Sequence, residues 1–181
     1  MCLFLNRLTR SKTASPRTRK KTRARLLGVT FIMVSFETAK KTFDEKRPKQ
    51  FLENPMHCDE CEEVERNAAS NDLESVTADI ASGGYASFLS FLSDEAYCYY
   101  FPAFVRICLE SKGDEENEFL PDFMFSLTYE GNENDRLKYF SDDQKRYVYE
   151  LLEYIECEMK HEVWLWLVSE DLQEAKRIWK M

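Results

Sequence analysis

The sequence is poor in residues that interrupt regular structure, and it has no long apolar run. Its 181 residues include only five Gly and five Pro, which excludes the collagen-like and low-complexity classes. No segment approaches the ~20 consecutive apolar residues of a membrane-spanning helix. Only two His are present, and P-loop, dinucleotide-binding, G-x-S-x-G and H-E-x-x-H motifs are all missing. We therefore expect no membrane partner, and we favour a non-catalytic protein over an enzyme.

Apolar residues are nevertheless abundant. They make up 44% of the chain, and aromatic residues make up 14%. This content is too high for a wholly disordered chain. The length is that of one small domain with a genuine core, with or without a tail.

Positive charge is concentrated at the beginning of the chain. Residues 1–49 hold 14 Lys or Arg and 3 Asp or Glu, whereas residues 50–181 hold 11 and 30. The first 25 residues carry nine basic side chains and no acidic one. We expect residues 1–35 to be a basic leader that is disordered or non-native, and residues 36–181 to form an acidic helical domain.

Four interpretations of the leader compete. Its Arg- and Ser-rich composition resembles an organelle transit peptide. The run Arg17–Arg25 is typical of a nucleic-acid-binding arm or a nuclear-import patch. The apolar stretch Leu26–Phe36 resembles the core of a secretory signal, but Glu37–Lys41 lacks the small-residue cleavage pattern. We favour the fourth, a true start at Met33, because this leaves 149 residues of uniform character with 16 basic and 33 acidic side chains, net −17.

Capping residues and apolar spacing predict four to five helices in one mostly α domain. Phe36–Met56 is expected to mix helix and loop. Asn71 or Asp72 is expected to cap a short helix that ends at Gly83. The apolar stretch Phe119–Tyr129 fits a helix and a strand equally well.

The most strongly patterned helix is expected to begin at Ser93, a hydroxyl cap followed by two carboxylates. Its apolar stripe is aromatic-rich and has helical spacing. The stripe consists of Tyr97, Tyr100, Phe101, Phe104, Val105 and Cys108. Pro102 costs about 3 kcal/mol in a helix interior, so we expect this central helix to kink or break near Tyr99–Phe101. The rings are expected to form core rather than a ligand-binding site.

Two further helices are predicted near the C-terminus. Ser141 and Gln144 have the capping-box spacing, and the apolar residues that follow them fall on two helix faces. One face carries Val148, Leu151, Leu152, Ile155 and Met159, and the other carries Tyr147, Tyr154 and His161. Two such faces indicate a helix packed between neighbours. Ser169 is expected to cap a last helix that buries Trp179.

One cluster of residues suggests a metal site. Cys58-x-x-Cys61, with His57 adjacent, places two thiolates at a spacing that can bind one tetrahedral ion. Cys157 and His161 are the best further donor pair, because positions i and i+4 share a helix face. We therefore predict a Cys₃His zinc site from Cys58, Cys61, Cys157 and His161. Zinc is the only cofactor that the sequence suggests.

Two alternatives remain for the same cysteines. A redox dithiol needs a lowered thiol pKa, whereas nearby carboxylates should raise the pKa by disfavouring a second negative charge. Otherwise Cys58 and Cys61 are a free pair, and His161 is a solvated helix residue. The six Cys without a secretory signal indicate reduced thiols and a cytoplasmic location.

Three short motifs occur in order along the acidic body. They are His57-Cys58-x-Glu60-Cys61, Phe91-Leu92-Ser93-x-Glu95-Ala96-x-x-Tyr99-Tyr100-x-Pro102-Ala103 and Phe140-Ser141-x-x-Gln144. Over about residues 36–156 the chain resembles a bacterial domain-of-unknown-function family with HCxEC, FLSxEAxxYYxPA and FSxxQ motifs. The resemblance implies a shared fold and brings no activity, substrate or catalytic residue with it.

Three functional hypotheses follow from these observations. The first is a small cytoplasmic protein of the immunity or antitoxin kind, which binds a basic protein partner through its acidic surface. The second is a zinc-binding protein that uses the Cys58-x-x-Cys61 cluster. The third is nucleic-acid binding through Arg17–Arg25, which requires the basic arm to be native.

Overall fold

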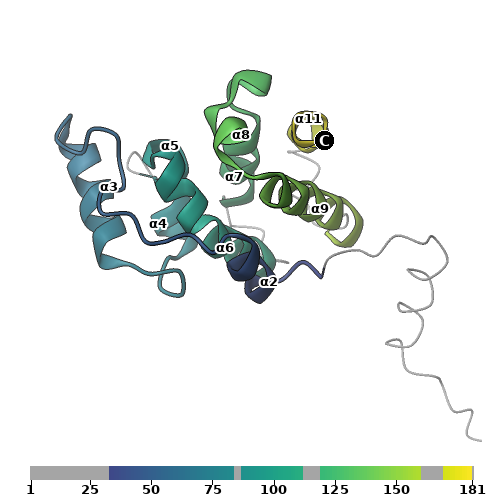
Figure 1. The fold of residues 1–181 in the computed structure, drawn as a ribbon, viewed down its shortest axis with the longest axis horizontal. Coiled ribbons are helices and arrows are strands. Elements are labelled where there is room, and N and C mark those ends of the chain that lie inside the picture. Colours follow the sequence, from purple (N-terminus) through teal and green to yellow (C-terminus); the bar gives the residue numbers. More distant parts are fainter. Residues whose placement is uncertain (1–32, 84–86, 112–118, 160–168, 181) are drawn as a thin grey trace, which may run out of the picture. The chain divides into compact units, whose positions relative to one another are not determined.

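The structure is a computed structural model that describes residues 33–83, 87–111, 119–159 and 169–180 (Figure 1). All of these residues belong to the compact unit Ile32–Met181. Within these ranges every regular element is helical, which confirms the mostly α prediction. The elements are α2 (Phe36–Thr42), α3 (Asp59–Ser70), α4 (Ala78–Ser82), α5 (Phe88–Phe91), α6 (Asp94–Glu110), α7 (Phe119–Thr128), the 3₁₀ turn η2 (Gly131–Glu133), α8 (Asp135–Tyr139), α9 (Asp142–Glu158) and α11 (Ser169–Trp179).

Some predictions concern residues outside the described ranges. Most of the predicted leader lies there, as does the basic run Arg17–Arg25, and so does His161. The role of the leader, the nucleic-acid arm and the start at Met33 therefore stay predictions.

The predicted number of four to five helices is wrong. The described ranges contain nine α-helices, of which α2, α4, α5 and α8 have only seven, five, four and five residues. Helices this short show too few turns for an apolar stripe to stand out from a loop. The predicted number of helices was too low because the prediction relied on apolar stripes, which these short helices do not show.

The short helix expected after Asn71 or Asp72 begins later than predicted. The Asp72 carboxylate accepts hydrogen bonds from the amides of Glu74 (3.1 Å) and Ser75 (2.9 Å), and these bonds close a turn instead of a helix. Thr77 caps α4 in its place by accepting a hydrogen bond from the Ile80 amide, and the helix ends before Gly83 as expected.

Helix α6 lies at the centre of the fold and is rich in aromatic residues, as predicted. Ser93 caps it by accepting a hydrogen bond from the Ala96 amide. The helix runs without interruption from Asp94 to Glu110 although Pro102 lies inside it, so of the predicted kink or break, the break does not occur. Most of its side chains are buried, and this burial offsets the one backbone hydrogen bond that Pro102 cannot donate.

Aromatic rings from several other segments surround α6. The Phe101 ring stacks on Phe43 at 4.4 Å and lies 5.8 Å from Phe123 of α7 and 5.7 Å from Phe140, measured between ring centroids. Phe140 in turn lies 5.4 Å from Trp179 of α11. Ring pairs at these separations and tilts add to the burial of their apolar area. The predicted aromatic stripe is therefore core.

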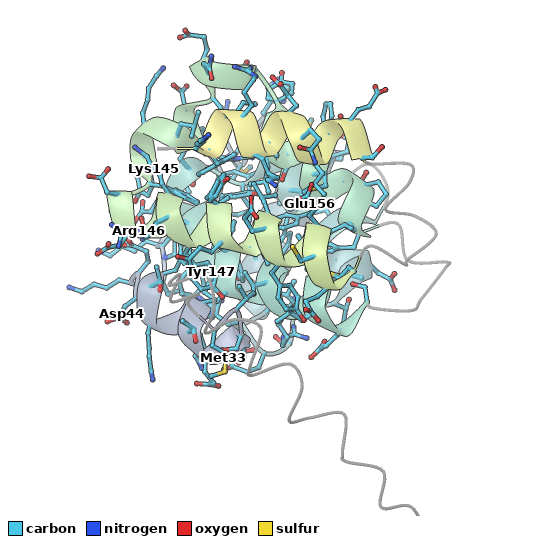
Figure 2. The ribbon with its side chains drawn as sticks, turned by 90° about the vertical axis from the view of Figure 1, so that its right-hand side faces the viewer. Met33, Asp44, Lys145, Arg146, Tyr147 and Glu156 are labelled. Atoms are coloured by element: carbon cyan, nitrogen blue, oxygen red, sulfur yellow. The ribbon has the colours of Figure 1, made fainter. Side chains whose placement is uncertain are left out.

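Helix α9 begins with the predicted capping box. The Ser141 hydroxyl accepts from the Gln144 amide, and the Gln144 side chain accepts from the Ser141 amide. Helix α9 packs between α2 and α11 (Figure 2), as the two-faced pattern predicted. Tyr147 reaches α2, where its hydroxyl donates to the Ser35 carbonyl at 2.9 Å.

The C-terminal end of α3 is fixed by side chains from two other segments. Arg47 donates to the carbonyls of Ala68 (2.9 Å) and Ala69 (2.7 Å), and the Tyr100 hydroxyl donates to Ala68 (2.7 Å) and Asn71 (2.9 Å). The last carbonyls of a helix have no partners within the helix, so these bonds satisfy groups that would otherwise be orphaned. They anchor the helix whose other end carries the cysteine pair.

None of the helices in the described ranges is long and apolar enough to cross a membrane.

Candidate metal centre

The cysteine pair lies at the N-terminus of α3, where Cys58 is the capping residue. Cys58 has an extended backbone (φ −158°, ψ 170°), and its Sγ accepts a hydrogen bond from the Cys61 amide at 3.4 Å. This conformation directs the Cys58 side chain toward the first turn of the helix, which also carries Cys61. The two Sγ atoms are consequently 3.3 Å apart.

His57 completes a group of three donors. Its Nδ1 lies 3.9 Å from the Sγ of Cys61, and the donor atoms of His57, Cys58 and Cys61 all lie within 4.8 Å of one another. Tetrahedral zinc with Zn–S bonds of about 2.3 Å requires sulfur atoms ~3.8 Å apart. The sulfur atoms would need to separate by only about 0.5 Å to reach that geometry.

The three donors differ in their exposure to solvent. Cys61 is buried, Cys58 is half-buried and His57 is exposed. Val64, one turn after Cys61, is fully buried, so the apolar side of α3 packs into the core while its N-terminus stays at the surface. An ion could therefore reach the group from solvent.

The backbone amide of Cys61 and the side chains around Cys58 shift the pKa of Cys58 in opposite directions. The hydrogen bond from the Cys61 amide lowers this pKa, but hydrogen bonding to Glu60 and to the Cys61 thiol, together with desolvation, raises the net value above the usual range. The same contact with Cys58 lowers the pKa of the Glu60 carboxyl. The direction predicted from the acidic neighbours is therefore confirmed for Cys58.

Four exposed carboxylates surround the group on the first two turns of α3. They belong to Asp59, Glu60, Glu62 and Glu63. Within the described residues none of the four takes part in a salt bridge, since every ion pair there uses other acidic side chains. Their uncompensated charge favours a divalent cation over a thiolate without metal.

The structure brings together only part of the predicted zinc ligand set. Cys58 and Cys61 are adjacent, whereas Cys157 is exposed near the end of α9, and Figure 1 shows α3 and α9 on opposite sides of the unit. His161 lies outside the described residues. The four-residue set stays a prediction, and His57 is the donor that the geometry adds.

His57 could have been found from its position directly before Cys58. The i, i+4 spacing between His57 and Cys61 is not a helical contact, because α3 starts only at Asp59. The imidazole approaches Cys61 because the chain turns before the helix, and no spacing rule describes that turn.

The remaining described cysteines show no such grouping. Cys98 and Cys108 are buried in α6, and all five cysteines of the described residues are free thiols. Burial raises the pKa of both α6 thiols to about 12, which makes them poor ligands and poor nucleophiles.

Comparison with known proteins identifies one family. The model of a family described as a Family of unknown function (DUF6714) matches residues 37–179. This is consistent with the predicted resemblance to a domain-of-unknown-function family, and the match extends beyond residue 156 to include α11. No curated protein and no solved structure matches the chain.

Proposed function

Because the chain belongs to DUF6714, a family whose function is unknown, we propose a function from the chain's own residues: it binds a zinc ion through His57, Cys58 and Cys61. The observation that carries the proposal is the convergence of three donor atoms within 4.8 Å at the start of α3. One imidazole and two thiolates are a donor set typical of zinc.

The residues around the site support metal binding over redox chemistry. A reactive dithiol requires a stabilised thiolate in the absence of metal, but the pKa of Cys58 is raised, and the neighbouring Glu60 carboxylate contributes to raising it. A bound dication reverses this balance, since it replaces the thiol protons and is attracted by the surrounding carboxylates. The Cys61 amide then donates to a Cys58 thiolate, a stronger bond than one to a neutral thiol.

Three protein donors fill three of the four positions of a tetrahedral zinc ion and leave the fourth position for another ligand. Sites with three protein ligands and one exchangeable position are typical of zinc that acts as a Lewis acid, whereas four protein ligands are typical of structural zinc. Cys157 and His161 remain the predicted additional ligands. If either of them binds the ion, the site is of the four-ligand structural kind; if neither does, it is of the three-ligand kind with an exchangeable position.

Elemental analysis of protein loaded with zinc and freed of excess metal tests the proposal. We expect about one zinc per chain in the wild type and less than ~0.2 in Cys58→Ser and Cys61→Ser, because the remaining donors hold the ion weakly. Cys157→Ser tests the first of the two additional predicted ligands, an exposed thiol outside the three-donor group. His161→Ala tests the other predicted ligand.

The outcomes distinguish the alternatives. Retention of zinc by Cys157→Ser and His161→Ala supports the three-donor site, and loss of zinc in either supports the four-ligand prediction. A wild-type protein that binds less than ~0.2 zinc per chain contradicts the proposal and leaves Cys58 and Cys61 as a free pair.

We also propose that the acidic surface binds a basic protein partner, because the exposed carboxylates of α3 have no salt-bridge partners within the described part of the chain. Clustered charge of one sign steers a partner of opposite charge and gives binding that weakens with salt. Within this surface, we expect the exposed carboxylates of Asp59, Glu60, Glu62 and Glu63 on α3 to contribute most to binding of the partner.

Affinity purification from the native host with matched charge variants tests this second proposal. We expect a basic protein to be retained by the wild type and lost on the triple variant Asp59→Asn, Glu62→Gln, Glu63→Gln. The control neutralises three exposed acidic residues elsewhere, Glu130, Glu133 and Glu170, and should retain the protein. The proposed role of the α3 carboxylates is contradicted if both triple variants retain the basic protein equally, or if no basic protein is recovered with the wild type.

A further inference from the structure

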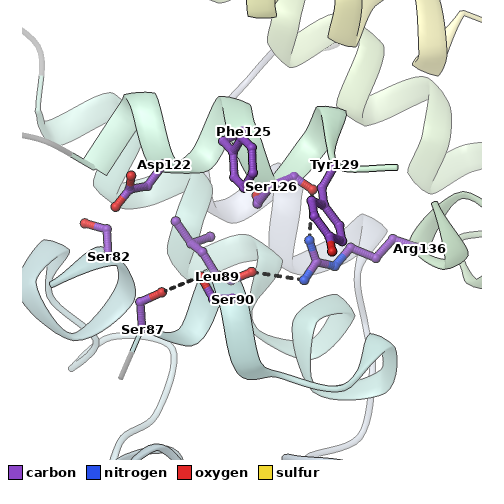
Figure 3. A pocket seen from close by; sticks show the side chains of 9 residues that line it. All are labelled: Ser82, Ser87, Leu89, Ser90, Asp122, Phe125, Ser126, Tyr129 and Arg136. Carbon is purple, nitrogen blue, oxygen red and sulfur yellow. Dashed lines mark hydrogen bonds between the residues drawn. The ribbon is translucent and has the colours of Figure 1, made fainter. Parts of the chain in front are cut away.

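A pocket separate from the metal centre lies where α4, α5 and α7 meet, with Arg136 of α8 at one end (Figure 3). Its volume is about 510 Å³, within the range of small-molecule sites. The described residues that line it combine apolar side chains and hydroxyls with one guanidinium and one carboxylate. The nature of a ligand therefore depends on which of the two charged groups is open to it.

Arg136 is held in a fixed position by the protein. It donates from Nη1 to the Ser126 carbonyl at 2.8 Å and from Nη2 to the Leu89 carbonyl at 3.0 Å. Its guanidinium carbon lies 3.9 Å from the ring centroid of the fully buried Tyr97. These contacts set the plane of the guanidinium before any ligand arrives and use two of its five N–H donors.

The charge of Arg136 is not neutralised by a carboxylate. No salt bridge in the described part of the chain involves this residue. Arg136 is also half-buried, so its charge is partly removed from water. A cation in this situation is stabilised by an anion that accepts charge-assisted hydrogen bonds from its remaining N–H groups.

The carboxylate of the pocket is not open to a ligand in the same way. It belongs to Asp122, which Figure 3 shows beside Ser82 and across the pocket from Arg136. Asp122 already interacts with another group of the protein. Its charge is therefore not left for a cationic ligand, and the charge that the pocket can recognise is a negative one at the Arg136 end.

The rest of the pocket offers apolar and aromatic surface. Phe125 and Tyr129 are 59% and 54% exposed, and their ring centroids lie 5.7 Å apart. Figure 3 shows Leu89 and Phe125 between Arg136 and Asp122. A flat apolar ring bound here would cover part of both exposed aromatic side chains, and rings at such separations favour one another beyond their buried area.

We propose that this pocket binds a small aromatic monocarboxylate. The ligand carboxylate accepts hydrogen bonds from the remaining N–H donors of Arg136, a pairing that the guanidinium geometry favours. The ligand ring lies against Leu89, Phe125 and Tyr129. A ligand without the carboxylate leaves Arg136 without a counterion, and a ligand without the ring leaves the aromatic side chains exposed, so tight binding requires both parts.

Titration followed by amide chemical shifts, with benzoate and 3-phenylpropionate as probes, tests the proposal. We expect saturable shifts at α5, α7 and α8, with a Kd of about 1 mM or tighter for at least one probe. Three control compounds each lack one part: acetate lacks the ring, 3-phenylpropanol lacks the charge, and 3-phenylpropylamine has the opposite charge. We expect each control to bind at least ~10-fold more weakly than the better probe.

Variants assign the binding to the pocket. Phe125→Ala removes an exposed ring and is expected to weaken binding of the better probe about 5-fold or more. Tyr139→Ala is the matched control, because this exposed aromatic side chain does not line the pocket and its removal should leave the affinity unchanged. Arg136→Gln removes the charge and is expected to weaken binding at least ~10-fold. Because Arg136 also holds two backbone carbonyls, a melting curve must show that this variant is folded.

Three results would overturn the proposal. They are the absence of saturable shifts with both probes, binding of 3-phenylpropanol or 3-phenylpropylamine as tight as that of 3-phenylpropionate, and equal affinities in Phe125→Ala and Tyr139→Ala. The pocket shares no residue with the metal centre, so the Cys58→Ser variant is expected to bind the probe as the wild type does.

Discussion

Replacing Trp179 with Ala is expected to lower the free energy of unfolding by about 3–5 kcal/mol, one of the largest effects of any single substitution in this chain. Trp179 is 1% exposed, and its Nε1 donates to the Leu127 carbonyl of α7 at 2.9 Å. The substitution leaves a cavity beside Phe140 and removes the hydrogen bond that the Leu127 carbonyl accepts from the indole. Chemical denaturation measures the effect.

Two further variants separate the causes. Trp179→Phe retains an aromatic ring but not the hydrogen bond, and it is expected to cost about 1–3 kcal/mol. Tyr139→Ala is the control, because this aromatic side chain on α8 is 44% exposed and its removal should change stability by less than about 0.5 kcal/mol. A Trp179→Ala variant as stable as Tyr139→Ala would mean that α11 does not belong to the core.

Raising the pH from 8 to 10.5 is expected to destabilise the protein by several kcal/mol. Desolvation raises the pKa of Cys98 and of Cys108 from 9.0 to about 12 and that of Tyr147 from 10.0 to about 12. It also raises the pKa of Tyr97 and of Tyr100. All five groups are held neutral by the folded state.

The sign follows from proton binding. Above pH 9 the unfolded chain loses protons that the folded chain retains, so stability is full below pH 9 and falls as the pH rises toward 12. One pKa unit corresponds to about 1.4 kcal/mol, so at pH 10.5 the two thiols together account for about 4 kcal/mol. The tyrosines add to this loss once the pH exceeds 10.

Cysteine variants assign the alkaline effect to the buried thiols. For each variant, the free energy of unfolding at high pH is compared with that of the same variant at pH 8, so that a pH-independent effect of the substitution on stability cancels. The double variant Cys98→Ala, Cys108→Ala should lose much less stability between pH 9 and 10, whereas Cys157→Ala, which removes an exposed thiol, should behave like the wild type. Unfolding free energies of the wild type that are equal at pH 8 and 10.5 would contradict the prediction.

The sequence predicted the features that depend on neighbouring residues. Ser93 caps α6, and Ser141 forms a capping box with Gln144, because a cap requires only a hydroxyl and amides two or three positions later. Phe119–Tyr129 was ambiguous because its apolar residues are too dense for one period to dominate. Packing decides this segment, since the buried Phe123 ring contacts both Phe101 and Phe104 of α6.

The features that sequence reasoning missed depend on contacts between distant segments. The Arg136 guanidinium, for example, is positioned by the carbonyls of residues 89 and 126, which lie 47 and 10 positions earlier in the chain. A carbonyl carries no information about residue type, so no motif could indicate this arrangement. The role of His57 was missed for a related reason, because it depends on a turn that the Cys58 cap creates.

The packing of α2 affects how the protein can fold during synthesis. Ser35, the cap of α2, is hydrogen-bonded to Tyr147, 112 positions later, and α2 also packs on α6. In a nascent chain emerging from the ribosome, α6 can therefore cover only part of the apolar side of α2, and the rest stays exposed until α9 has been translated. During that interval the Phe43 ring has Phe101 as its earliest partner, while Phe140 and Tyr147 arrive only later.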